Sequence, residues 1–239
     1  MVTEVLRLGD LSVEVVRKEI KNIHLSVYPP KGRVKIAAPA RMTLDTIRVF
    51  VISKMGWIRQ QQEKLLAQER EPAREYLEKE SHYFWGRRYL LKVIAKDSPQ
   101  RVELKHRTLN LHVRPGTGMT AKRELLEEWY RAQLRAGLEP LIAKWESILR
   151  VKVGKIFVQR MKTKWGSCQP ASRNLRFNTE LAKKPLECLE YLVVHEMLHL
   201  LEPTHNARFV TLMDQFLPKW QHRRQQLNRL PIRHEDWGY

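Results

Sequence analysis

The chain has 239 residues, of which 43% are hydrophobic, and its 44 Lys and Arg residues exceed its 26 Asp and Glu residues by 18. This length can bury one large core or two small ones, and seven Trp, seven Tyr and six Phe residues argue against disorder. No apolar run reaches the roughly 18 residues of a membrane helix, residues 1–10 lack a secretory signal pattern, and two cysteines cannot form a disulfide framework. We therefore expect a cytoplasmic protein with no membrane partner.

The excess of positive charge favours polyanionic partners. A net charge of +18 attracts nucleic acids and anionic substrates. The same excess can also be spread over solvated helix faces, where it carries no function. A nucleic acid partner bound through a basic surface therefore stays open, and the sequence does not indicate an oligomeric state.

The first third of the chain is predicted to form three strands and a helix. Apolar and polar residues alternate over 11–15, 23–27 and 34–38, which is typical of half-buried strands. Thr43 is expected to cap a helix that continues to about Lys64.

A second group of strands follows a charged segment at residues 70–80 that is expected to be a linker. The predicted strands are 89–94, 101–104 and 109–113, and a helix from Thr120 to about Leu149 comes next. This order repeats that of the first third, so the two segments are either an internal duplication or two ordinary sheet-and-helix units. We place the domain boundary in the linker, with an N-terminal strand-and-helix unit at residues 1–75 and a second domain at 76–239.

The last third is predicted to hold three short strands and three helices. The expected strands are 156–160, 162–168 and 174–177, and the expected helices are 185–201, 205–216 and 218–230. Pro185 suits the first turn of a helix, and Pro203 disfavours helical geometry in the residue before it.

Residues 195–199 read His-Glu-Met-Leu-His, a His-Glu-x-x-His sequence within an apolar segment. In a helix, His195 and His199 lie one turn apart, where two imidazoles can chelate one zinc ion, and Glu196 lies on the same side. A catalytic zinc keeps an open position for a water molecule and lowers the pKa of that water. The pattern predicts a zinc hydrolase with Glu196 as the general base. Two partly buried structural histidines are the alternative.

The third zinc ligand is expected to be His205. Its interval from His195 equals that in the extended His-Glu-x-x-His-x-x-Gly-x-x-His pattern. Glu202 occupies the position of the Gly and precedes Pro203, so the chain must turn back towards the metal in another way. Glu202 is the alternative metal ligand, or it accepts a hydrogen bond from the ring N–H of a histidine ligand.

Other residues around this helix form a recognisable set. They are residues 162–168 (Lys-Thr-Lys-Trp-Gly-Ser-Cys), residues 191–200, Asn178, His205, Phe209, Pro218, Arg223, Arg224 and Leu227. The set resembles the YgjP-like metal-dependent hydrolases, which are classed as zincin metallopeptidases and have the SprT-like proteases as more distant relatives. The resemblance covers the whole chain and is strongest from about residue 160 to 230. Lys164 stands where an Arg is usual. It keeps the positive charge but cannot make the two parallel hydrogen bonds of a guanidinium group.

The resemblance implies an α+β fold. In it, N-terminal strand-plus-helix units precede a zincin-like, minigluzincin-type catalytic domain with one zinc ion and an active-site helix under a small mixed sheet. It also implies that residues 162–168 form a strand beside the metal. Such a strand could align an extended peptide by backbone hydrogen bonds, and Gly166 would permit close approach. Trp165 could line this groove or pack in the core.

Residues 150–164 contain six basic residues and no acidic one. In a regular strand, Arg160, Lys162 and Lys164 would share a face. They could hold an acidic substrate or phosphates near the metal, or form a solvated surface.

The sequence is compatible with three functions, of which a zinc metallopeptidase acting on a peptide or protein is predicted. In it, Lys164 or Arg208 would steady the oxyanion. A hydrolase of nucleotide phosphoanhydrides would fit the charge, but the sequence lacks a dense carboxylate cluster for magnesium. A basic nucleic-acid-binding module with a structural zinc would need four ligands, and three are visible. The candidates for substrate binding are Arg160, Lys162, Lys164, Trp165, Gly166, Asn178 and Arg208.

Overall fold

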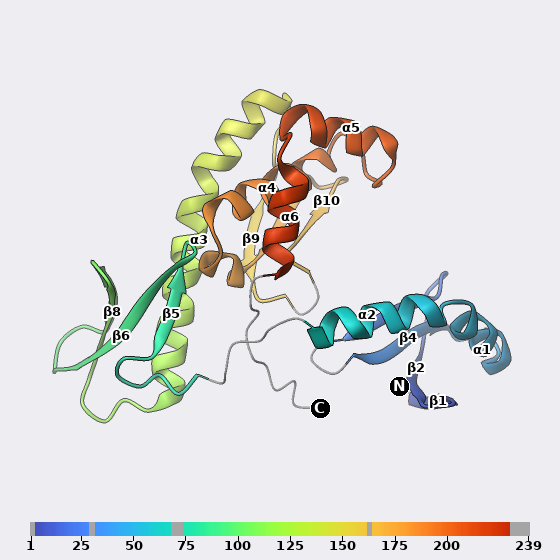
Figure 1. Cartoon of the computed structure of the whole chain (residues 1–239), viewed down its shortest axis with the longest axis horizontal. Helices are drawn as coiled ribbons and strands as arrows, with labels where there is room; N and C mark the ends of the chain where they lie inside the picture. The colour runs from blue at the N-terminus through green and yellow to red at the C-terminus, as the bar shows by residue number, and fades with distance from the viewer. Residues whose placement is uncertain (1–2, 29–31, 68–73, 162–163, 230–239) are drawn as a thin grey trace. The chain divides into compact units, whose positions relative to one another are not determined.

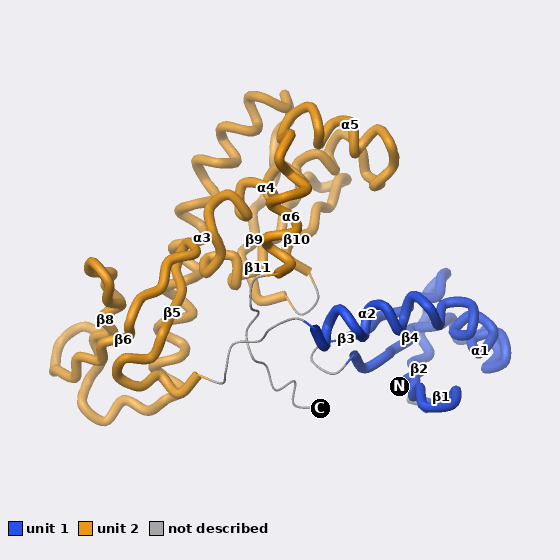
Figure 2. Tube along the Cα trace, in the orientation of Figure 1, with its two compact units in different colours: residues 1–69, 235–239 blue, residues 70–234 orange. Residues whose placement is uncertain are grey.

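The computed structural model describes residues 3–28, 32–67, 74–161 and 164–229. The chain divides into two compact units, residues 1–69 with 235–239 (unit 1) and residues 70–234 (unit 2), which Figure 2 colours separately. Among the described residues, no helix has the length and apolarity needed to cross a membrane.

Unit 1 is a four-stranded sheet packed against two helices. Its strands are β1 (Thr3–Leu8), β2 (Leu11–Lys18), β3 (His24–Tyr28) and β4 (Arg33–Pro39), and its helices are α1 (Leu44–Ser53) and α2 (Met55–Ala67). The alternating apolar residues of β2 and β4 face the helices, and Val13, Ile36, Ile47, Val51 and Ile58 are fully buried in one core.

Two features of unit 1 differ from the prediction. The expected single helix is two, because the chain leaves helical geometry at Lys54, whose backbone N–H donates to the carbonyl groups of Ile52 and Val51. The strand β1 was not expected, since Val5 on its outer face is 61% exposed and breaks the apolar alternation around buried Leu6.

Unit 2 begins with a sheet of the same topology. Its strands are β5 (Ser81–Phe84), β6 (Arg87–Ala95), β7 (Arg101–Lys105) and β8 (Thr108–Val113). The orders β1-β2-β4-β3 and β5-β6-β8-β7 correspond strand for strand, and in each sheet two antiparallel pairs flank a central parallel pair. The repeated pattern in the sequence is therefore a repeated sheet in the structure. The strand β5 was missed because its buried residues include a histidine, His82.

The helix α3 (Met119–Leu149) connects this sheet to the rest of unit 2 (Figure 1). One face of its 31 residues is buried, at roughly helical spacing from Leu126 to Leu149. It contacts β7 and β8 of this sheet as well as β9, η1 and α4. Unit 2 therefore has one continuous core that includes both the sheet and the predicted metal-binding helix.

The last third of the chain forms a three-stranded mixed sheet and three α-helices. The strands are β9 (Ile156–Gln159), β10 (Gly166–Gln169) and β11 (Asn174–Asn178), in the order β10-β11-β9. A 3₁₀ helix, η1 (Thr179–Lys183), precedes α4 (Leu186–Leu198), α5 (Ala207–Phe216) and α6 (Trp220–Arg229). The fold is thus α+β with small mixed sheets, as expected.

The predicted strand at residues 162–168 is wrong at Lys164 and Trp165. β9 ends at Gln159 and β10 begins at Gly166, so Arg160 and Lys164 lie outside any strand. Lys162 lies outside the described residues. The alternation that was expected to place the three basic side chains on one strand face therefore fails for Arg160 and Lys164.

Candidate metal centre

The helix α4 is bonded to α3 and α6 through Glu190, which lies N-terminal to the histidines. The carboxylate of Glu190 accepts hydrogen bonds from Lys144 Nζ at 2.8 Å, Trp145 Nε1 at 3.3 Å and Arg223 Nη1 at 2.8 Å. Burial acts to raise the pKa of Glu190, but the hydrogen bonds from Lys144 and Arg223 hold the pKa below its usual value. Because these partners lie on α3 and α6, the carboxylate ties three helices together. Glu190 was not singled out from the sequence.

Three imidazoles converge beyond this point. His195 lies in the last turn of α4, His199 is the C-cap residue of α4, and His205 lies just before α5. One nitrogen from each ring lies within 4.8 Å of the other two, and within the described part of the chain these three residues are the one group with metal-binding geometry. The Nε2 atoms of His195 and His205 are 3.0 Å apart.

His199 has its tautomer set by the turn that follows α4. Its Nδ1 lies 3.1 Å from the carbonyl oxygen of Glu202, so Nδ1 carries the proton and donates it, and the Nε2 lone pair is left for a metal. The Glu202 backbone therefore acts as the acceptor, while its carboxylate accepts from the Thr204 hydroxyl at 3.1 Å. No residue from 199 to 206, all of them described, has positive φ. The turn is made by helical and 3₁₀ hydrogen bonds to Leu198 and Met197 rather than by a glycine.

Burial keeps two of the rings neutral. It lowers the pKa of His195 to about 3, with smaller contributions from His199, His205 and Arg224. Burial also lowers the pKa of His199. A neutral imidazole has the lone pair that metal coordination requires, so both rings are ready to bind an ion at neutral pH.

Phe209 forms the floor under the three rings. Its ring centroid lies 5.0 Å from that of His195, 4.8 Å from that of His199 and 4.8 Å from that of His205, and only 3% of the residue is exposed. Its position is fixed by Asn206, the N-cap of α5, whose side chain accepts the backbone N–H of Phe209 at 3.0 Å. Asn206 therefore fixes the start of α5, next to His205, and the position of Phe209. The role of Asn206 was not foreseen, although Asn is a common N-cap.

Glu196 lies against the edge of the small sheet. The residue is 5% exposed, and burial raises the pKa of its carboxyl to about 7, while the charge of Lys164 and a hydrogen bond from the backbone of Cys168 act to lower it. A Cβ atom built on Gly166 would lie 2.8 Å from Glu196 Oε1 and 3.0 Å from its Cγ. Gly166 therefore permits the close approach of Glu196, whereas the sequence suggested a close approach of substrate.

The strand β10 is an edge strand of the described sheet, because it pairs with β11 alone. The carbonyl of Trp165 accepts from Asn178 N–H at 2.8 Å, on the side of β11. Backbone groups alternate in direction along a strand, so those of Gly166 and Cys168 point to the open edge. The bond from Cys168 N–H to Glu196 agrees with this direction. The edge beside the histidines therefore has backbone groups available for an extended ligand.

Asn178 shapes the segment before β10. Its side-chain amide donates to the carbonyl oxygens of Met161 at 2.8 Å and Lys164 at 3.0 Å, and the residue is 6% exposed. Asn178 thus acts on the backbone near the site. Trp165 packs against the core of unit 2, and the Lys184 ammonium lies 5.8 Å from its ring centroid.

Of the other candidates, Arg160 lies in a pocket that includes none of the three histidines, and Arg208 lies beside Glu202. Arg160 lines a separate pocket between β5, α3 and η1, together with His82, Glu180 and Lys183. The Arg208 side chain is 72% exposed and lies 3.9 Å from the Glu202 carboxylate.

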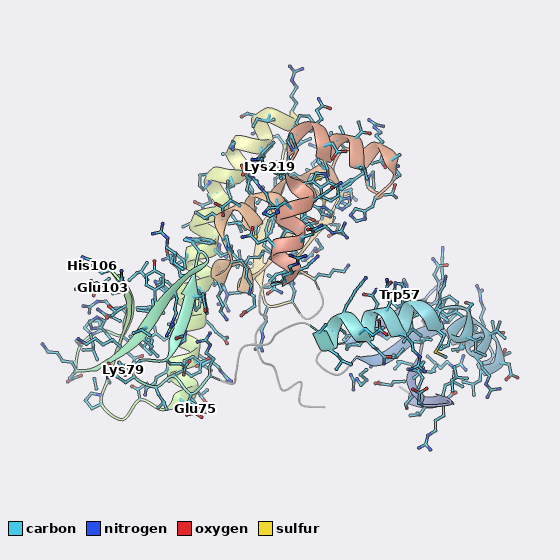
Figure 3. All side chains as sticks on the ribbon, in the orientation of Figure 1. Trp57, Glu75, Lys79, Glu103, His106 and Lys219 are labelled. Atoms are coloured by element: carbon cyan, nitrogen blue, oxygen red, sulfur yellow. The ribbon has the colours of Figure 1, made fainter. Side chains whose placement is uncertain are left out.

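His82 in that pocket is a buried neutral imidazole. The residue is 2% exposed, and its Nε2 lies 3.0 Å from Glu80 Oε1. Burial, aided by the charges of Arg74 and Lys183, lowers the pKa of His82 to about 3. Among the remaining described histidines, His106 is exposed in the turn between β7 and β8 (Figure 3) and belongs to no metal-binding group.

The donor set fits a zinc ion. Three neutral nitrogen ligands with an open fourth position are typical of catalytic zinc, and Zn–N bonds of about 2.0–2.1 Å separate tetrahedral ligands by roughly 3.3 Å. The 3.0 Å separation of the Nε2 atoms of His195 and His205 is close to this value.

The chain is similar to known metallopeptidases. A family model described as "YgjP-like, metallopeptidase domain" matches residues 21–230. Among solved structures, the metallopeptidase zymogen jannalysin of Methanocaldococcus jannaschii is similar, with 18% sequence identity and a TM-score of 0.34 over 37% of this chain and 91% of that one. No curated protein matches.

Proposed function

Because the chain belongs to the YgjP-like metallopeptidase family and is a metal-dependent hydrolase, we propose that it cleaves peptide bonds at one zinc ion held by His195, His199 and His205. The observation that carries this proposal is the convergence of the three imidazoles beside a buried carboxylate. We further propose that residues from about 76 onward form a minigluzincin-type zincin domain, and that the N-terminal strand-and-helix unit is a separate domain.

When bound, zinc would act as a Lewis acid on the scissile carbonyl and would lower the pKa of a water molecule. The three histidine rings are already oriented to bind the ion, because the Glu202 carbonyl fixes the ring of His199 and Phe209 packs under all three rings. Preorganised ligands of this kind hold the reacting groups in place.

Glu196 is the proposed general base. It lies next to His195 in the sequence and is held by Cys168 N–H and by contact with Gly166, so its carboxylate has one position beside the histidines. From there it takes a proton from the attacking water and passes it to the leaving amine. Lys164 is the nearest candidate for steadying the developing oxyanion, since its charge already acts on Glu196.

The open edge of β10 is the proposed binding site for the substrate backbone. An extended peptide could pair with both backbone groups of Gly166 and with the carbonyl group of Cys168, which face away from β11, while the Cys168 N–H is already bonded to Glu196. Asn178 would support this edge by fixing the carbonyl groups of Met161 and Lys164. Arg208 stays a candidate for a contact at the rim of the site.

The experiment that tests the proposal offers an unstructured polypeptide and a nucleoside triphosphate, separately, to zinc-loaded protein. We expect cleavage of the polypeptide only, and loss of both zinc and cleavage in the His195→Ala/His199→Ala variant. Hydrolysis of the triphosphate without cleavage of the polypeptide would favour the nucleotide hydrolase instead. Zinc retained in the double variant would exclude the proposed ligands.

A further inference from the structure

A second cleft in unit 2 lies at the far end of the edge strand β10. Its walls are the C-terminal end of α3, the turn between β10 and β11, and Leu200 and Leu201, which directly follow His199. Pro170 is the first residue after β10, and four residues at about 3.3 Å each place it about 13 Å from Gly166. A peptide extended along β10 from Glu196 would therefore reach this cleft three or four residues from the scissile bond.

Two arginines line the cleft in a backbone conformation that arginine rarely adopts. Arg150 and Arg173 both have φ of 54°, in the left-handed region that favours Gly or Asn. Each is held there by hydrogen bonds. The Arg150 N–H donates to the Glu146 carbonyl, while Arg173 N–H donates to the Pro170 carbonyl at 3.2 Å and its own carbonyl accepts from Gly154 N–H at 2.8 Å. Strained residues of this kind concentrate at functional sites.

The cleft has a surplus of positive charge. Its third cation, Lys152, donates to Glu146 at 2.8 Å, and the same carboxylate accepts Val153 N–H at 2.8 Å. The single acidic side chain of the cleft is thus already used by Lys152. Within the described ranges, neither Arg150 nor Arg173 makes an ion pair, and both are exposed.

We propose that Arg150 and Arg173 form a specificity subsite for an acidic side chain of the substrate, three or four residues from the scissile bond. This inference rests on the proposed function, and it narrows the substrate class to peptides with Glu or Asp at that distance. An acidic side chain would find two guanidinium groups, carried by residues whose backbones are held by hydrogen bonds, beside the apolar surface of Leu200 and Leu201. A peptide fits the cleft better than a nucleic acid, because the cleft continues the edge to which a peptide backbone would pair.

The test uses a neutral peptide whose cleavage site has been mapped, and derivatives with one Glu, or one Gln, at each of the four positions on either side. Cleavage is measured as kcat/KM, and binding is measured by fluorescence anisotropy on the Glu196→Gln variant. We expect one position, three or four residues from the cleaved bond, at which Glu is preferred over Gln roughly tenfold in both measurements.

The variant Arg150→Gly/Arg173→Asn removes both charges and places at each site a residue suited to left-handed geometry. We expect it to lose the preference while its Tm is kept or raised. The matched control, Arg107→Gln/Arg135→Gln, removes two exposed charges of unit 2 outside the cleft and should keep the preference.

The outcomes separate the two proposals. Cleavage without a Glu preference, or a preference that survives in the cleft variant, overturns the subsite and leaves the peptidase standing. A binding preference that depends on the two arginines, without any cleavage, supports the cleft as a site for an acidic peptide side chain and removes the peptidase, and with it the distance from a scissile bond. If no peptide is bound or cleaved, both proposals are wrong.

Discussion

Replacing Gly166 with Ala is expected to displace the proposed general base while leaving the metal site intact. The new Cβ would lie 2.8 Å from Glu196 Oε1, 3.0 Å from Cγ and 3.1 Å from Cδ. Because non-bonded carbon–oxygen contacts in proteins are rarely closer than about 3.3 Å, the carboxylate must move by about 0.5 Å or more. Glu196 is 5% exposed, so the movement also disturbs its hydrogen bond with Cys168.

Since a misplacement of about 1 Å can cost about 100-fold, a shift of about 0.5 Å in a catalytic group is expected to lower kcat/KM roughly 10-fold or more, and the crowding should cost about 1–3 kcal/mol of stability. The assay is hydrolysis of an unstructured polypeptide by Gly166→Ala, together with its zinc content and unfolding midpoint. Gly118→Ala is the control, because a Cβ at Gly118 would meet no atom within 4 Å. Full activity in a folded Gly166→Ala protein would refute the reasoning that Gly166 sets the position of Glu196.

Three further changes test the site and its support. His205→Ala should weaken zinc binding at least about 100-fold in a competition titration with a chelator, whereas His222→Ala should not, since His222 is exposed on α6; equal losses would contradict the ligand assignment. Asn178→Ala removes two hydrogen bonds from a buried amide to the carbonyl groups of Met161 and Lys164 and should lower the free energy of unfolding in urea by about 1–3 kcal/mol, so an unchanged value would show that the amide is dispensable. His82 has a folded-state pKa near 3, below its unfolded value of about 6.5, so its contribution is complete above pH 6.5 and is lost as the pH falls towards 3. Wild type should therefore lose about 2 kcal/mol more than His82→Gln between pH 7.5 and pH 5, and parallel urea curves would contradict this.

The convergence of the histidines could be predicted from the sequence because it depends on local spacing. The interval between His195 and His199 is fixed by the helical repeat, and the apolar residues around them indicated that this helix is buried. The alternating strands of both sheets were predicted for the same reason. The three histidines do converge, and their role as zinc ligands stays a prediction.

What could not be predicted depends on contacts between distant residues. Asn178 acts through hydrogen bonds to carbonyl groups 14 and 17 residues away, and Glu190 through partners on two other helices. Neither set of contacts has a sequence periodicity. The basic residues before β10 were misread because strand alternation was assumed at Arg160 and Lys164, which lie outside any strand. Arg160 instead lines a pocket with His82.

The most direct test of the central claim is the kcat/KM of Glu196→Gln for an unstructured polypeptide, measured on protein shown by elemental analysis to carry zinc. Glutamine has nearly the same shape as glutamate but cannot accept the proton of the attacking water. The account predicts about one zinc per chain in both proteins and a loss of activity on the order of 10²–10⁴-fold in the variant. Wild-type activity in the zinc-loaded variant would contradict the assignment of Glu196 as the general base.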